Sequence, residues 1–383
     1  MHPLPTTRSF HLGLSLVLVL VALIAPLACN AESWHVFFGT GGLGADGIYR
    51  SEFDTTNGKL SPAIKVATAS SPGFLALHPR GGILYAVATL EKVPVVAAYR
   101  INADGSLSFL SQSPVGDGAS AHIAVHPSGR FLLTAQYGGG SVALFPLDSE
   151  GKPGAAQLTE HAGGARVVAK RQDSPHPHWC GFSPDGRFAL VPDLGLDRIV
   201  IYRVDQNKPA IEPHGYATSL PGSGPRHLRF SPDGRFIYLL EELSLTVTTF
   251  AWDAANGTAK RLSTVPTLSE ETKAAEAMNA AAEILVHPNG RFVYASNRGN
   301  DTVTVFHADP ETSALMPVQV QPVRGAFPRN INLAPGSGWL LAAGQDSNTV
   351  SVHKLDSITG KLTFQTKGVI NLPAPICILF VKK

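Results

Sequence analysis

The sequence predicts an all-β protein, a seven-bladed β-propeller with four antiparallel strands in each blade. The first observation is a repeated segment in which an apolar run ends at a Pro-containing turn and a second apolar run follows. Its prolines are spaced 48, 57, 48, 56 and 47 residues apart, at Pro79, Pro127, Pro184, Pro232, Pro288 and Pro335. Most of them are followed by a Gly, and Pro and Gly suit successive positions of a tight turn. Each copy therefore predicts a β-hairpin.

A second repeated strand follows each hairpin, with period-2 alternation and an acidic residue at or near its end. Its seven copies are residues 48–54, 95–101, 142–148, 199–205, 247–253, 303–309 and 350–356. A Gly-containing segment and a weakly patterned strand come next, so one period holds four strands. The 383 − 31 = 352 residues after the leader make seven periods of about 50, which is typical of propeller blades. A β-helix has shorter repeats, and the Trp-Asp pair of WD repeats occurs once.

The two ends of the repeat array are each incomplete, and they are expected to complete each other. Apolar strands at residues 34–39 and 376–381 would both join the seventh blade. This arrangement would close the ring with N- and C-terminal strands in one blade and would remove the exposed sheet edges.

The first 31 residues predict a signal peptide, so residues 32–383 would form the propeller domain. Arg8 and His11 precede an apolar run over residues 12–25, and small residues lie before Glu32. A retained anchor and a lipid on Cys29 are the alternatives. The lipid is disfavoured because Pro26 stands where a Leu is usual. We expect a periplasmic or secreted protein.

Composition excludes several function classes. With 31 Lys+Arg against 29 Asp+Glu, the net charge of +2 offers no electrostatic footprint for nucleic acid. The chain has no Gly-x-Ser-x-Gly elbow, no His-Glu-x-x-His and no P-loop. We expect no cofactor, no metal, no membrane span after the leader, and a monomer. Cys180 and Cys377 lack metal or redox spacing and are expected to be buried, unpaired thiols.

The order of strands sorts the polar residues onto one face of the ring. In an antiparallel blade, the start of the innermost strand and the end of the second strand lie on the same face. The residues at these points are rich in His, Arg and carboxylate: His122, His176, His178, Arg226, His227, Glu283, Arg329, Asn330, Gln136, Tyr137, Asp193, Glu242, Asn297, Arg298 and Gln345. Charged groups that meet at a tunnel mouth carry a desolvation penalty unless they pair with one another or bind a ligand. The set therefore predicts a ligand site.

Other features of the repeat are given structural roles or left open. On the opposite face, four arginines follow turn glycines and are interpreted as solvated turn residues: Arg130, Arg187, Arg235 and Arg291. Three histidines that precede turn prolines are interpreted as packing or turn residues: His78, His126 and His287. A metal site at His176 and His178 would lack a third and fourth ligand. Insertions at residues 149–175 and 258–282 should overhang the His/Arg/Glu face as lids or plain loops, and the second has the composition of a short helix after Ser269.

Nine segments then resemble, in order, the bacterial lactonase family of seven-bladed propellers, which includes 6-phosphogluconolactonase and the fungal carboxymuconate cyclases. They cover nearly all of the chain after the leader, at residues 136–142 (QYGGGSV), 174–178 (SPHPH), 191–198 (VPDLGLDR), 224–228 (GPRHL), 241–243 (EEL), 282–284 (AEI), 294–299 (YASNRG), 328–330 (PRN) and 375–377 (PIC). The chain departs from the family pattern at residues 39–41, where a Tyr commonly follows Gly-Thr, and at residues 86–89, where Asn-Glu is common. The substrate contacts of the first blade therefore do not carry over.

The resemblance implies a metal-independent lactonase that opens a sugar-acid lactone, either 6-phosphogluconolactone-like or an unphosphorylated aldonolactone. It implies His178, Arg226, Glu242 and Arg298 as catalytic residues. Glu242 or His178 would be the general base and the two arginines would bind the oxyanion or an anionic substituent. Substrate-binding residues are expected among the rest of the same face, at His176, His227, Glu283, Asn297, Arg329, Asp193 and Gln345. The alternatives are a carboxymuconate-type cyclase and a non-catalytic exported propeller that binds a protein or envelope ligand.

Overall fold

The computed structural model describes residues 1–5 and 33–383, and most of the predicted signal peptide therefore lies outside the described residues. Every strand and helix that the described residues form lies in the unit Glu32–Lys383. No helix among them is long and apolar enough to cross a membrane. The strands form seven antiparallel sheets, each of which is one blade of the propeller.

The strand bounds follow the predicted repeat, and each blade is given from its innermost strand outward. The closing blade holds β29 (Pro375–Lys382), β1 (Ser33–Thr40) and β2 (Gly47–Asp54), with β3 (Lys59–Leu60) and β4 (Ile64–Thr68) both paired to β2. The next three blades are β5 (Leu75–Leu77), β6 (Ile83–Leu90), β7 (Val93–Ile101) and β8 (Leu107–Pro114); β9 (His122–Val125), β10 (Phe131–Gln136), β11 (Ser141–Pro146) and β12 (Gln157–Glu160); and β13 (Gly181–Phe182), β14 (Phe188–Asp193), β15 (Arg198–Val204) and β16 (Ile211–Thr218).

The last three blades have the same organisation, with one short helix between two of them. They are β17 (Pro225–Phe230), β18 (Phe236–Glu241), β19 (Thr246–Asp253) and β20 (Thr258–Pro266); β21 (Ala280–Val286), β22 (Phe292–Arg298), β23 (Thr302–Ala308) and β24 (Leu315–Pro322); and β25 (Pro328–Leu333), β26 (Trp339–Gly344), β27 (Thr349–Leu355) and β28 (Leu362–Asn371). Helix α1 (Glu270–Ala274) begins after Ser269, whose side chain accepts a hydrogen bond from Thr272 N. This confirms the helix expected in the second insertion.

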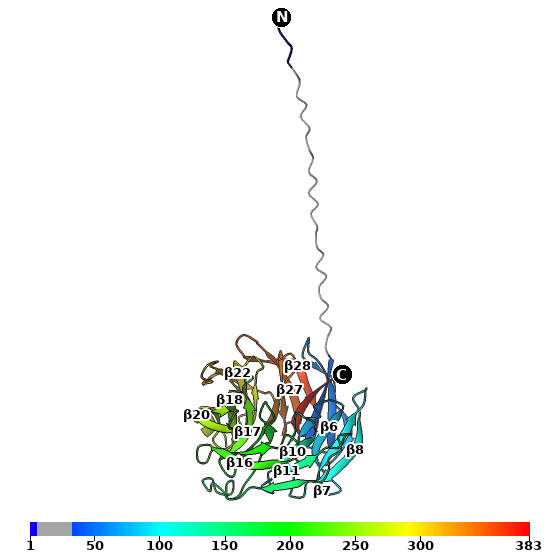
Figure 1. Ribbon diagram of the computed structural model, residues 1–383, viewed down its shortest axis with the longest axis vertical. Coiled ribbons are helices and arrows are strands. Elements are labelled where there is room, and N and C mark those ends of the chain that lie inside the picture. Colours follow the sequence, from blue (N-terminus) through cyan, green and yellow to red (C-terminus); the bar gives the residue numbers. More distant parts are fainter. Residues whose placement is uncertain (6–32) are drawn as a thin grey trace. The chain divides into compact units, whose positions relative to one another are not determined.

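The blades close into a ring, and the predicted seven-bladed propeller is confirmed. The blades contact one another in the order of their innermost strands, β29, β5, β9, β13, β17, β21 and β25, with β17 reaching the β13 blade through β14, and β25 contacts β29 again. The chain ends share one blade, as expected, because β1 pairs with β29 from Trp34↔Lys382 to Gly39↔Cys377. Figure 1 shows the red C-terminal strand beside the blue strands of the N-terminal part.

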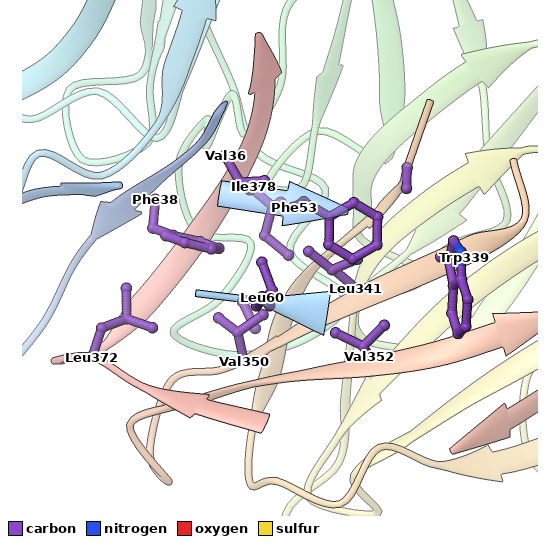
Figure 2. Packing of buried hydrophobic residues seen from close by; sticks show 12 residues of the cluster. Val36, Phe38, Phe53, Leu60, Trp339, Leu341, Val350, Val352, Leu372 and Ile378 are labelled. Carbon is purple, nitrogen blue, oxygen red and sulfur yellow. The ribbon is translucent and has the colours of Figure 1, made fainter. Parts of the chain in front are cut away.

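The hydrophobic core lies between neighbouring blades. Val36, Phe38 and Phe53 of the closing blade pack against Leu341 and Val350 of the last blade (Figure 2), and all five are fully buried. Burying one such side chain contributes about 1.5–3 kcal/mol. Since these clusters join the sheets of neighbouring blades, this inter-blade packing holds the ring together.

Turn residues on the face opposite to the predicted site link each blade to the next. His78 Nε2 lies 3.1 Å from Gly129 O of the following blade, and Gly129 has φ +68°. Four arginines donate to carbonyl oxygens in the turn of the next blade, so they are more than solvated turn residues: Arg130 to Gln206 and Asn207, Arg187 to Ala254, Arg235 to Pro310 and Arg291 to Ser357.

The described cysteines, Cys180 and Cys377, are buried and unpaired, as expected. Burial raises the pKa of Cys377 to about 12, so it is a protonated thiol at neutral pH. Cys180 is equally enclosed and its pKa is also raised by burial.

Candidate active site

Two adjoining cavities open among the residues that the sequence placed on one face. An outer cavity of about 440 Å³ is lined by His178, Glu242, Arg298 and Arg329, together with Tyr137, Arg171 and others. An inner cavity of about 160 Å³ is lined by Arg226 and His227 and also by His178 and Arg329. The two share His178, Arg329 and residues 119–121 in their walls. All four residues proposed as catalytic therefore meet around one site.

β-Bulges at the inner ends of three strands aim the charged side chains toward this site. The pairing register shifts between Pro225 and His227 in β17 and between Pro328 and Asn330 in β25. These shifts place Arg226 and Arg329 at equivalent bulge positions after a Pro. A bulge adds an unpaired residue and re-aims its side chain, so both guanidinium groups reach the cavity from the innermost layer.

The third bulge, in β21, leaves backbone carbonyls free to hold two arginines. The register of β21 shifts between Ala281 and Ile284. Arg298 donates from Nη2 to Ala281 O at 2.9 Å and from Nε to Ala280 O at 3.3 Å, while Arg226 Nη1 donates to Ala282 O. Both guanidinium groups are thereby fixed in place before any ligand arrives.

Glu242 is the one carboxylate that lines the outer cavity, and three arginines surround it. Its Oε2 accepts from Arg226 Nε at 2.9 Å and lies 3.1 Å from Arg298 Nη2, while its Oε1 accepts from Arg171 Nη2 at 2.6 Å. Burial would raise the pKa of Glu242, but the charges of Arg298 and Arg226 outweigh burial and hold the pKa far below its usual range. Glu242 is thus a permanent anion whose two oxygens are both engaged.

Arg329 has no such partner. Among the described residues, no hydrogen bond or ion pair forms to its guanidinium, although it lines both cavities. Burial and the charge of Arg298 lower the pKa of Arg329 to about 10. Four guanidinium groups therefore face one carboxylate, and the cavity walls carry an excess of positive charge.

His178 and His227, the inner-cavity histidines, complete the polar lining. Their ring centroids lie 5.2 Å apart. Burial, then the charge of Arg226, lowers the pKa of each imidazole well below the ordinary value. Both rings are therefore neutral at pH 7 and can accept a proton or a hydrogen bond.

The other predicted site residues are close by but line neither cavity. His176 stacks on Tyr137 at 4.6 Å, and its Nδ1 lies 2.7 Å from Tyr137 O. Asp193 accepts from His176 N at 2.8 Å, Gln345 Nε2 donates to Gly41 O at 2.6 Å, and Asn297 Nδ2 bonds to Thr302 and Thr304 within its own blade. Glu283 is fully buried behind the inner cavity.

Sequence reasoning missed Arg171 and gave Tyr137 no role. Arg171 comes from the first insertion, which was expected to overhang this face, but no motif marks it within that loop. Its Nη2 bridges Glu242 Oε1 and, at 3.3 Å, Tyr137 Oη. The second insertion contributes no lining residue to either cavity.

Both departures from the family pattern lie at the inner cavity. Gly41 belongs to the first departure, and Val87, Ala88 and Thr89 belong to the second. The part of the cavity wall contributed by the closing blade and the next blade is therefore where this chain differs from the family pattern.

Comparison with known proteins agrees with this geometry. A family model described as "Lactonase, 7-bladed beta-propeller" matches residues 35–380. A 6-phosphogluconolactonase from Bacillus subtilis is 29% identical over 339 residues, which cover 88% of this chain and 95% of that protein. A 6-phosphogluconolactonase from Formosa agariphila is 32% identical over 324 residues, 82% of this chain and 90% of that protein.

Solved structures give the same result. The periplasmic gluconolactonase of Pseudomonas aeruginosa superposes with a TM-score of 0.84 at 29% identity, covering 91% of this chain and 99% of that chain. A Lactobacillus plantarum protein superposes with a TM-score of 0.85 at 28% identity, covering 91% of this chain and 100% of its own. The family match over nearly all of the propeller confirms the resemblance found in the sequence, and the chain belongs to the seven-bladed β-propeller lactonase family.

Proposed function

We propose that this protein hydrolyses the lactone of a sugar acid to the open acid, without a metal ion. One observation carries the proposal: four guanidinium groups and two neutral imidazoles line adjoining cavities around a single, fully engaged carboxylate. Lactone hydrolysis needs a site that binds developing negative charge and a base that activates water. Family membership supports the same chemistry.

The arginines are suited to the oxyanion that forms when water attacks the lactone carbonyl. Arg226 and Arg298 are held by β21 carbonyls and by Glu242, so they need no reorganisation during the reaction. Donors that are prearranged in a water-poor site stabilise such charge strongly. Glu242 then acts by orienting these arginines.

The same contacts disfavour Glu242 as the general base. Its oxygens already accept from Arg226 and Arg171 and lie close to Arg298, and its pKa is far below its usual range. A general base needs a lone pair that is free to take the proton from water. Of the two bases expected from the resemblance, His178 is the one with a free ring nitrogen, because its Nδ1 is buried and has no hydrogen-bond partner in the described part of the chain.

The excess positive charge supports a substrate with an anionic substituent. Arg329 is available to a phosphate or carboxylate, and Arg171 is partly exposed at the outer rim. A 6-phosphogluconolactone would use both cavities, with its phosphate among these arginines. An unphosphorylated aldonolactone is the alternative that fits the expected export, and the relative from Pseudomonas aeruginosa is named a periplasmic gluconolactonase.

The test is pH-stat hydrolysis of δ-gluconolactone and 6-phosphogluconolactone, compared with the spontaneous rate. Arg226→Ala and Glu242→Gln should each lower kcat by about 10²–10³-fold, while Arg261→Ala, an exposed arginine on β20, should leave it unchanged. A preference for one of the two lactones shows whether the substrate carries a phosphate. If the folded protein accelerates neither reaction, the proposal is wrong and a propeller that only binds its ligand is favoured.

A further inference from the structure

Glu283 and His227 form a buried carboxylate–imidazole pair behind the inner cavity. Glu283 Oε1 lies 3.0 Å from His227 Nδ1, and both side chains are essentially inaccessible to solvent. The same oxygen accepts from Arg229 Nη2 at 2.9 Å and from Ile284 N at 3.1 Å, and Oε2 accepts from Asn330 Nδ2 at 2.7 Å. Both oxygens of Glu283 therefore act as hydrogen-bond acceptors.

The pair selects one tautomer of His227. Because Oε1 accepts from its other two partners, His227 Nδ1 is assigned as the donor and carries the proton. Nε2 is then an unprotonated nitrogen with a free lone pair, and it is buried without a partner among the described residues. The ring lines the inner cavity next to Arg226 and Arg329. An oriented base with a free lone pair thus lies beside Arg226, one of the two arginines proposed to bind the oxyanion.

We propose that His227 is the general base of the hydrolysis and that Glu283 is the positioning residue that orients it. This inference rests on the proposed lactonase function. His227 Nε2 takes a proton from water while the water oxygen bonds to the lactone carbonyl carbon and the carbonyl electron pair moves to its oxygen, beside the arginines. The tetrahedral intermediate then expels the ring oxygen, which takes the proton back from Nε2. The product is the hydroxy acid, which ionises in solution.

The contrast with His178 supports this assignment. No protein side chain hydrogen-bonds to the His178 ring among the described residues, so nothing selects its tautomer. A catalytic base is normally oriented by a third group, and of these two histidines only His227 has one within residues 33–383. His178 lies 5.2 Å from His227 and 5.4 Å from Tyr137 by ring centroids, where it can bind a substrate hydroxyl.

The charges around His227 set the limits of its role. Burial opposes the protonation of His227, and so do four nearby arginines: Arg226, Arg229, Arg329 and Arg298. The carboxylate of Glu283, which lies 3.0 Å from Nδ1, favours it. The neighbouring His122 is neutral, because burial lowers the pKa of that ring as well. His122 lies 5.5 Å from the His227 ring. The imidazolium that forms during the reaction therefore depends on Glu283 for its stability.

Glu283 also has a structural role, which the experiment must separate from positioning. Its network joins β17, β21 and β25, and Asn330 Oδ1 extends it to Ile378 N on β29. Asn332→Ala removes another hydrogen bond between β25 and β29, from Asn332 Nδ2 to Ile378 O at 2.8 Å, and Asn332 makes no hydrogen bond to Glu283 or His227 within residues 33–383. It is the matched control for a purely structural effect.

We would measure kcat and KM for the preferred lactone, product affinity by calorimetry, and melting temperature for the wild type, His227→Gln, His178→Gln, Glu283→Gln and Asn332→Ala. General base catalysis contributes about 10²–10⁴-fold. His227→Gln should therefore lose at least about 100-fold in kcat with little change in product affinity. Glu283→Gln should lose about tenfold or more in kcat with KM unchanged. Asn332→Ala should keep kcat within about threefold, and His178→Gln should act mainly on KM.

Imidazole rescue gives a readout that structural damage would not produce. Added imidazole should restore part of the rate to His227→Ala and none to Glu283→Gln. If a variant does not fold, the tautomer of His227 can still be measured by NMR on the wild type labelled with ¹⁵N-histidine. His227 should show a protonated Nδ1 and an unprotonated Nε2. The opposite tautomer, or a His227→Gln enzyme within threefold of the wild-type kcat, overturns the dyad while leaving the lactonase intact. A wild-type protein inactive on both lactones removes the proposed function and the dyad with it.

Discussion

Replacing Arg329 with Met should make the protein more stable and a poorer catalyst. Arg329 lines both cavities and has no hydrogen bond or ion pair among the described residues. Its removal therefore leaves no carboxylate unpaired, in contrast to the loss of Arg226 or Arg298. Met preserves much of the apolar stem, so the change isolates the guanidinium charge.

The size of the effect follows from the pKa. Burial and the charge of Arg298 lower the pKa of Arg329 from the ordinary arginine value to about 10, which corresponds to roughly 3 kcal/mol at about 1.36 kcal/mol per pH unit. The folded-state pKa is the lower one, so the charged form destabilises the fold below about pH 10, and the penalty fades as the pH rises toward the ordinary pKa of arginine. Water reaches part of the side chain, so we expect Arg329→Met to raise the free energy of unfolding by about 1–2 kcal/mol at pH 7.

Thermal denaturation and kinetics together test this reasoning. The melting temperature of Arg329→Met should rise by roughly 1–3 °C. KM for 6-phosphogluconolactone should rise about 10–100-fold, because a hydrogen bond to a charged group contributes about 1.5–3 kcal/mol. Arg261→Met, which removes an exposed arginine from β20, should change neither value. A lower melting temperature with KM unchanged for both lactones would refute the idea of a strained, unpartnered charge reserved for an anion.

Three further predictions concern pH, the inter-blade turns and the rim of the site. The inner-cavity histidines have folded-state pKa values below their unfolded ones. The fold therefore has its full stability above about pH 6.5, and below that pH each histidine lowers the free energy of unfolding by about 1.4 kcal/mol per pH unit. A denaturation midpoint that is equal at pH 7 and pH 5 would contradict this. Gly129→Ala should cost about 1–3 kcal/mol by thermal denaturation, since φ is +68° and a Cβ would lie 2.7 Å from the His78 ring; a cost below about 0.5 kcal/mol would argue against that inter-blade link. Arg171→Ala should raise KM about tenfold yet change stability by less than about 1 kcal/mol, because its ion pair with Glu242 is partly exposed; a large drop in melting temperature would make Arg171 structural.

The sequence alone determined the architecture and the face that carries the site. Turn residues and period-2 alternation are local signals, and seven copies of one pattern leave little choice of fold. The order of antiparallel strands then placed His178, Arg226, Glu242 and Arg298 on one face, and the structure brings them around adjoining cavities. The catalytic roles, the leader and the export that it implies stay predictions.

Only the tertiary structure decided how the charges are paired. Asn297 and Glu283 occupy the predicted face, yet neither lines a cavity, while Arg171 reaches Glu242 from a loop 71 positions away in the chain. Glu283 meets His227 across 56 positions because a bulge in each of their strands turns both side chains inward. Partners of this kind come from different blades, and their distance depends on bulge register and ring closure. No local pattern of residues encodes these quantities. Only the closed ring shows that His227 has a carboxylate partner, Glu283, and that Arg329 has no hydrogen bond or ion pair within residues 33–383.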